Sequence, residues 1–135
     1  MGLVRTTLTL TNPKRPELDP VEVNALVDSG ALHLCVPEHV ALQLQLDEHD
    51  KREVALADGS KRLISYQGPL AVAVGKRRCL TGAMVLGSEV LLGAIPMEDM
   101  DLVIRPSTRE VVPNPANPNF AGSVAMGIKP FTSPG

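Results

Sequence analysis

Hydrophobic and polar residues alternate along much of the first half of the chain. Residues 3–11 place leucines between threonines, and residues 21–27 place valines and an alanine between polar residues. Because successive side chains of a strand point to opposite faces, a period of two predicts strands with one buried face. Both stretches are therefore predicted to be β-strands, and the second runs directly into Asp28.

The remaining pattern is also rich in short strands. An Asp-Gly pair, Asp58-Gly59, separates apolar residues 54–56 from residues 63–66 and predicts a hairpin. Pro37 can open a short helix over residues 37–44, and a one-turn helix is expected at 96–100. Further strands are predicted at residues 70–74, 79–86, 91–92, 102–104 and 110–112. Many short strands with little helix predict an all-β, closed or sandwiched architecture.

The composition fits one globular domain. The chain has 135 residues, of which 44% are hydrophobic but only 2% aromatic, so aliphatic side chains should fill the core. A net charge of −2 argues against a broad basic face, and we predict no nucleic-acid partner. The short basic run Lys76-Arg77-Arg78 is interpreted as a solvated turn. We expect residues 1–113 to form the domain and the Pro- and Asn-rich residues 114–135 to form a tail or dimer arm.

The cysteines and the N-terminus bear on location. Cys35 and Cys79 lie in different apolar segments and match no metal spacing, which predicts free, buried thiols. The N-terminus turns polar within a few residues, and no apolar run reaches transmembrane length. These features predict a cytoplasmic protein without a signal peptide or a membrane partner.

Two motifs carry the candidate chemistry. Asp28-Ser29-Gly30-Ala31 follows the apolar pair Leu26-Val27, and a second apolar-apolar-Gly element, Leu91-Leu92-Gly93, comes later, before a short predicted helix. Asp-Ser-Gly alone is a common turn sequence. Together with the hairpin between them, the two motifs resemble the retropepsin-like (retroviral-type) aspartic proteases, and the hairpin and Leu92-Gly93-Ala94 look like the small bacterial members.

This resemblance implies a retropepsin-like closed acid-protease barrel that works as a homodimer. It makes Asp28 the catalytic carboxylate of an aspartic endopeptidase that cleaves a peptide or protein substrate. The other residues to which it assigns roles are Ser29, Gly30 and Ala31 in catalytic-loop support, Ala57, Asp58, Gly59 and Ser60 in a substrate-binding flap, and Leu91, Leu92 and Gly93 in packing beside the site.

One Asp-x-Gly motif per chain implies that the active unit contains a second copy. This hydrolysis needs one carboxylate to take a proton from water and another to supply one, and no metal or other cofactor is required. Two features depart from the family pattern. Ser29 replaces the commoner Thr, and Leu32 and Ala94 stand where the family has an Asp and its Arg partner. Loss of both partners leaves no unpaired charge, so the double absence is self-consistent.

Other interpretations are weaker. Asp28 could be an ordinary strand-end turn residue. His33, Cys35 and His39 could suggest a zinc site, but no fourth ligand is evident, and Cys35 with His39 lacks the third group of a thiol protease. Ser29 lacks the Gly-x-Ser-x-Gly context of a serine nucleophile. The main alternative is a non-catalytic dimeric peptide-binding or scaffolding module with the same fold, whose sign would be a damaged Asp28 loop, and that loop is intact.

Overall fold

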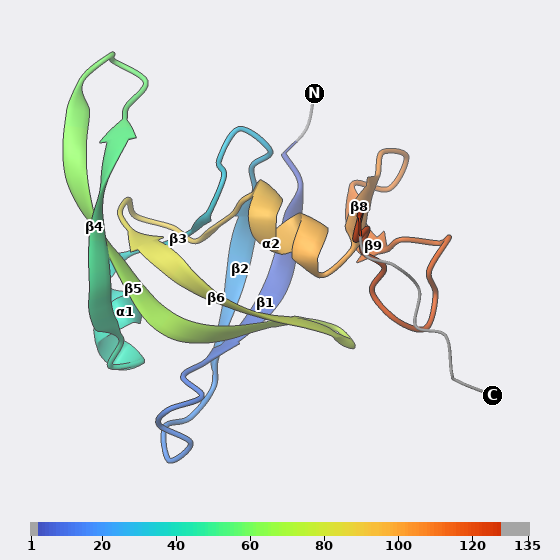
Figure 1. The fold of residues 1–135 in the computed structure, drawn as a ribbon, viewed down its shortest axis with the longest axis horizontal. Helices are drawn as coiled ribbons and strands as arrows, with labels where there is room; N and C mark the ends of the chain where they lie inside the picture. Colours follow the sequence, from blue (N-terminus) through green and yellow to red (C-terminus); the bar gives the residue numbers. More distant parts are fainter. Residues whose placement is uncertain (1–2, 128–135) are drawn as a thin grey trace.

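The computed structural model describes residues 3–127 and confirms the all-β prediction (Figure 1). Only two short helices occur in this part of the chain, and neither is long and apolar enough to cross a membrane. In chain order the elements are β1 (Arg5–Thr11), β2 (Val21–Val27), β3 (Leu34–Val36), α1 (Glu38–Gln43), β4 (Asp47–Ala55), β5 (Lys61–Val74), β6 (Arg77–Val85), β7 (Leu91–Leu92), α2 (Ala94–Asp99), β8 (Leu102–Arg105) and β9 (Glu110–Pro113).

All strands of the main sheet except β4 close into a barrel. The pairing order is β1, β2, β7, β3, β6 and β5, and β5 pairs back with β1 through Thr9–Thr11 and Ala71–Ala73. In the part of the chain that the structure describes, β4 pairs only with β5, so the end of this hairpin projects from the barrel, as Figure 1 shows at the left. β8 and β9 form a separate two-stranded sheet at the other end of the view.

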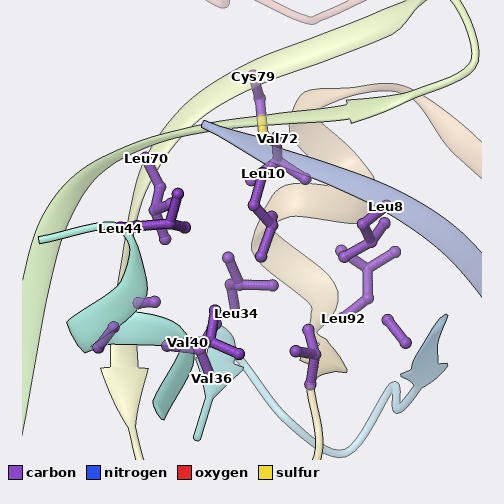
Figure 2. Packing of buried hydrophobic residues seen from close by; sticks show 14 of the residues in the cluster. Leu8, Leu10, Leu34, Val36, Val40, Leu44, Leu70, Val72, Cys79 and Leu92 are labelled. Carbon is purple, nitrogen blue, oxygen red and sulfur yellow. The ribbon is translucent and has the colours of Figure 1, made fainter. Parts of the chain in front are cut away.

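The barrel interior is aliphatic, as the composition predicted. Side chains from β1, β3, α1, β5 and β7 meet there (Figure 2). Leu8, Leu10, Leu34, Leu70 and Leu92 are fully buried. Burying a leucine is worth about 1.5–3 kcal/mol relative to leaving it exposed, so these five positions supply much of the driving force for closure. Cys35 and Cys79 are free and buried, also as predicted.

The hairpin strands are longer than the sequence pattern suggested. β5 is continuous from Lys61 to Val74, although residues 63–66 and 70–74 were predicted as separate strands, and a register shift between Gln67 and Leu70 accommodates Gly68-Pro69. β4 begins at Asp47, well before the apolar residues that marked it. Strand β3, which precedes α1, was not predicted. It became a strand because it lies between β6 and β7 in the closed ring.

The interpretation of Lys76-Arg77-Arg78 as a solvated turn is wrong for Arg77. This side chain is only 6% exposed. Its guanidinium donates hydrogen bonds to the carbonyl oxygens of Met100 at 3.0 Å, Asp101 at 3.4 Å and Asn117. A buried cation needs such acceptors, and here they come from a part of the chain remote in sequence.

Residues after β9 are fastened to the domain through Asp101. Its carboxylate accepts hydrogen bonds from the side chains of Asn114 at 3.1 Å and Asn117 at 2.8 Å and from the backbone N–H of Gly122 at 2.8 Å. We call this group the Asp101 clasp. These bonds, with a smaller effect of Arg77, lower the pKa of Asp101 below its ordinary value. Residues 128–135 of the predicted tail lie outside the described residues.

Candidate active site

The structure brings the two sequence motifs side by side. β2 and β7 are parallel, with Leu26 opposite Leu91 and Val27 opposite Leu92. The backbone N–H of Asp28 then donates to the carbonyl of Leu92 at 3.1 Å. Asp28 thus follows directly from a strand of the barrel and is fixed to the apolar-apolar-Gly element.

The Asp28 loop is closed by bonds of its own. The Ala31 N–H donates to the Asp28 carbonyl at 3.1 Å, and the Gly30 N–H donates to Asp28 Oδ1 at 2.9 Å. The second bond orients the carboxylate within its turn. Asp28 is half-buried, whereas Ser29 and Gly30 are exposed. The result is an oriented acid at the surface of a rigid framework.

Gly93 allows the backbone of the second motif to approach the Asp28 loop. Its φ of −86° and ψ of −176° are ordinary extended angles, so the need for glycine is steric. A Cβ atom there would lie 2.3 Å from the carbonyl oxygen of His33 and 2.8 Å from that of Ala31. The next two residues also bond to the loop, from Ala94 N–H to the Ala31 carbonyl at 2.8 Å and from Ile95 N–H to the Leu32 carbonyl at 2.9 Å.

A pocket of about 610 Å³ opens beside Asp28, between its loop and the β4 arm of the hairpin. Of the predicted site residues, it brings together Asp28, Gly30, Ala31, Ala57 and Leu91. Ser29 instead lines a smaller cavity of about 190 Å³, together with Leu92 and Gly93. The other lining residues of the larger pocket are Leu32, His33, Cys35, Arg52, Glu53, Val54, Ala55, Leu56, Met84 and Leu86.

The hairpin tip has a well-defined turn. The Leu56 N–H donates to the Ser60 carbonyl at 2.8 Å, and the Gly59 N–H donates to the Leu56 carbonyl at 2.9 Å. Gly59 has a φ of +87°, which favours glycine. Asp58 accepts bonds from the Ser60 hydroxyl and N–H, and these lower its pKa. Its carboxylate therefore faces the turn, while Ala57 reaches the pocket.

Arg52, Tyr66 and His33 form a cluster near the pocket that the sequence did not predict. The guanidinium carbon of Arg52 lies 4.3 Å from the centroid of the Tyr66 ring, and the His33 ring meets Tyr66 edge-on at 5.6 Å. Burial and then the charge of Arg52 lower the pKa of His33. Gly82 makes room for the ring, because a Cβ atom there would lie 2.5 Å from it. Ile64 and Tyr66 are two residues apart in a predicted strand and so share one face, which could have indicated the inward face of the hairpin.

The fold separates the residues of the motif that suggested a zinc site, His33, Cys35 and His39. His33 and Cys35 line the pocket, whereas His39 is exposed on α1. Within residues 3–127, no group of three or more His, Cys, Asp or Glu side chains is arranged to hold a metal ion. Burial and the negative charge of Asp28 raise the pKa of the Cys35 thiol, which disfavours the thiolate needed for nucleophilic attack.

Comparison with known proteins identifies the fold. No protein-family model and no curated protein matches the sequence. Among solved structures, the chain is similar to an EIAV protease in complex with an inhibitor, with 16% identity and a TM-score of 0.56 over 73% of this chain and 88% of that one. It is also similar to the retroviral protease-like domain of Ddi1 from Leishmania major, with 15% identity and a TM-score of 0.58 over 85% of this chain and 90% of that one.

These likenesses establish a retropepsin-like fold, as the two motifs implied. The barrel with its projecting hairpin and two short helices agrees with this class. The resemblance to small bacterial members remains a prediction.

Proposed function

We propose that the chain is one subunit of a homodimeric aspartic endopeptidase and that Asp28 supplies its catalytic carboxylate. The observation that carries the proposal is the setting of Asp28. It is a half-buried acid, oriented by the Gly30 N–H, on the wall of a pocket that the hairpin arm borders. A pocket of about 610 Å³ has room for several residues of an extended peptide.

The second carboxylate would come from Asp28 of another copy. A two-fold axis beside the loop would place the two acids together, and closed two-fold dimers are the commonest symmetric assemblies. Ser29 is exposed and lines a small cavity with Met97 and Ile104, on a surface that a second copy could cover. In the dimer, its hydroxyl would bond across the axis and hold the two loops together.

The chain ends are the proposed interface strands, at residues 3–10 and 110–112. Over Arg5–Leu8, β1 pairs with β2 but not with β5, so no strand within residues 3–127 pairs with its other backbone edge there. Arg5, Thr6 and Thr7 share a groove of about 580 Å³ with β9. The side chains of Leu8 and Leu10 are buried in the barrel, so the open backbone edge is the part available to a partner.

The chemistry follows from two acids at one site. Carboxylates about 3 Å apart cannot both ionise at low cost, so the pair shares one proton. The ionised Asp28 takes a proton from water as the water attacks the scissile carbonyl, and the protonated Asp28 hydrogen-bonds the carbonyl oxygen. The leaving amine then receives a proton. Activity should be greatest at mildly acidic pH.

The flap and the domain limits are part of the same proposal. Residues Ala57, Asp58, Gly59 and Ser60 would close over an extended substrate and exclude water, with Gly59 supplying mobility. Residues 1–113 would form the protease domain, and 114–135 an arm. The two free thiols suit a reducing cytoplasm, where we place the enzyme.

The test compares wild type with Asp28→Asn on a peptide library at several pH values. We expect cleavage by wild type only, and Asp19→Asn, at an exposed acid between β1 and β2, should retain it. Equal, nonzero cleavage by wild type and Asp28→Asn would refute the proposal. Absence of cleavage with retained peptide binding would favour the non-catalytic dimeric module.

Subunit mixing tests the shared site. A ninefold excess of Asp28→Asn should lower activity per wild-type subunit to about one tenth, because most wild-type copies then pair with the variant. Unchanged activity would mean that each chain works alone.

A further inference from the structure

One cation lines the candidate active site, and its hydrogen-bonding capacity is unused. Arg52 stands opposite Ile64 in the β4–β5 hairpin, and opposite residues of paired strands share one face. Ile64 is buried with Cys35 and Met84, both of which line the pocket. The inner face of the hairpin therefore presents Arg52 to the pocket, next to Val54.

The charge of Arg52 is held in place and is only partly balanced by a neighbouring acid. Its guanidinium stacks on Tyr66, which restricts its motion. Its Nε forms a long ion pair with the Asp50 carboxylate at 3.9 Å, and the two side chains are 42% and 59% exposed, so water screens this pair. Within residues 3–127, the Arg52 side chain donates no hydrogen bond. Its terminal N–H groups remain available to a ligand.

The other charged groups of the pocket do not cancel this cation. Glu53 lies opposite Leu63, which is 69% exposed, on the outer face of the hairpin. It also pairs with Lys61 at 3.4 Å across the strands. Asp28, by the proposed function, is engaged with water and the scissile bond. The rest of the lining is mainly aliphatic, namely Leu32, Val54, Ala55, Leu56, Ala57, Met84, Leu86 and Leu91.

We propose that Arg52 is a specificity-determining residue that binds the carboxylate of an Asp or Glu side chain in the substrate. This inference rests on the proposed function, because it assigns a substrate class to the same site. The preferred peptide carries aliphatic residues, which suit the lining, and an acidic residue within the segment that occupies the pocket. A guanidinium can donate two parallel hydrogen bonds to the two oxygens of a carboxylate. A peptide amide has one uncharged acceptor oxygen, so it binds a guanidinium more weakly.

Two-fold symmetry extends the inference to both sides of the scissile bond. Each copy would contribute its own Arg52, one beside the N-terminal half of the peptide and one beside the C-terminal half. Acidic residues at equivalent distances on both sides of the scissile bond should therefore each raise kcat/KM, and their effects should combine. A partly exposed pair of this kind is worth roughly a twofold to fivefold preference for the acid, so two independent pairs give roughly 4- to 25-fold.

The experiment uses peptides with an aliphatic cleavage sequence and a Glu or Gln scanned through each flanking position. For wild type, we expect kcat/KM to rise roughly twofold to fivefold with Glu in place of Gln at one position on either side of the scissile bond. Arg52→Gln should bring the Glu/Gln ratio close to one. Lys51→Gln is the matched control, because it removes the neighbouring positive charge from the outer face of β4 and should keep the wild-type ratio.

A charge reversal and a binding measurement complete the test. Arg52→Glu should prefer Lys over Gln at the position where wild type prefers Glu. The same peptides are titrated by fluorescence anisotropy against Asp28→Asn, with and without Arg52→Gln, and only the protein with Arg52 should favour Glu. Circular dichroism and thermal unfolding verify that each variant folds.

The outcomes separate this inference from the proposed function. Cleavage that depends on Asp28 but shows the same Glu/Gln ratio in wild type and Arg52→Gln overturns the inference alone. Absence of cleavage by every protein, with a Glu preference in binding that requires Arg52, overturns the endopeptidase proposal and supports the role of Arg52. A lack of Glu preference in both cleavage and binding overturns the inference in either case.

Discussion

Replacing Gly93 by alanine is the sharpest test of how the Asp28 loop is positioned. The backbone angles of Gly93 suit any residue, so the change acts through space alone. The new Cβ atom would lie 2.3 Å from the carbonyl oxygen of His33 and 2.8 Å from that of Ala31. These are backbone atoms, which cannot rotate away as the end of a side chain can.

The expected cost follows from these contacts. Overpacking in a tight site costs about 1–3 kcal/mol. Moving the strands apart would also weaken the bonds from Ala94 and Ile95 to the loop, each worth about 0.5–1.5 kcal/mol. We expect the free energy of unfolding to fall by about 2–6 kcal/mol, which corresponds to a melting temperature lower by roughly 7–20 °C for a domain of this size.

Thermal and urea unfolding of Gly93→Ala measure this effect, with Gly87→Ala as the control. Gly87 has a φ of +83° but no atom within 4 Å of an added Cβ, so its cost is the backbone strain of about 1 kcal/mol. A melting temperature of Gly93→Ala within a few degrees of wild type would refute the claim that this glycine is needed for the close approach. If both variants lost the same free energy of unfolding, the crowding at Gly93 would contribute nothing to the cost of its substitution.

Two further predictions concern titrating groups. Asp101→Asn replaces one of the two acceptor oxygens of the Asp101 clasp by an amide donor, which then faces at least one of the three donors, and should lower the free energy of unfolding. Because the clasp lowers the pKa of Asp101, this advantage of wild type is complete above the ordinary value of 3.8 and is lost as the pH falls through the lower, folded-state value. Urea unfolding at pH 7, 5 and 3 measures it, and a pH-independent difference contradicts the reasoning. In a Cys35→Ala background, burial and Asp99 raise the pKa of Cys79 to about 11. Its reaction with an aromatic disulfide at pH 8 should therefore be at least roughly 100-fold slower in the native than in the denatured protein, and rapid labelling of native protein would contradict this.

The sequence predicted strands well where one face is buried. Residues 3–11 and 21–27 alternate because one set of side chains enters the barrel, and both are strands in the structure. The first part of β4, Asp47–Glu53 in register with β5, shows no alternation because all its residues are exposed, so periodicity could not find it. Residues 63–66 and 70–74 were predicted as separate strands, but pairing with β4 and β6 on both sides keeps β5 continuous.

Long-range contacts account for what the sequence left unpredicted. Arg77 belongs to a basic run that suggested solvent, and its buried position depends on carbonyl groups of Met100, Asp101 and Asn117. The motifs around Asp28 and Gly93 were recognisable, because each needs a short local sequence. Arg52 was not, because a charged residue on an exposed strand gives no sign of the pocket it faces until the hairpin is folded beside the loop.

Closure of the barrel has a consequence for solubility. With the other strands of the main sheet joined in a ring, β4 carries an outer edge that is unpaired along its whole length within the described residues. An unpaired edge can pair with the strand of another molecule and start aggregation. The first seven of the nine residues of β4 read Asp-Glu-His-Asp-Lys-Arg-Glu, and every one of these seven is exposed. Parallel stacking of such strands in register would place each charge beside the same charge of the next copy, which disfavours joining of copies through their hairpins.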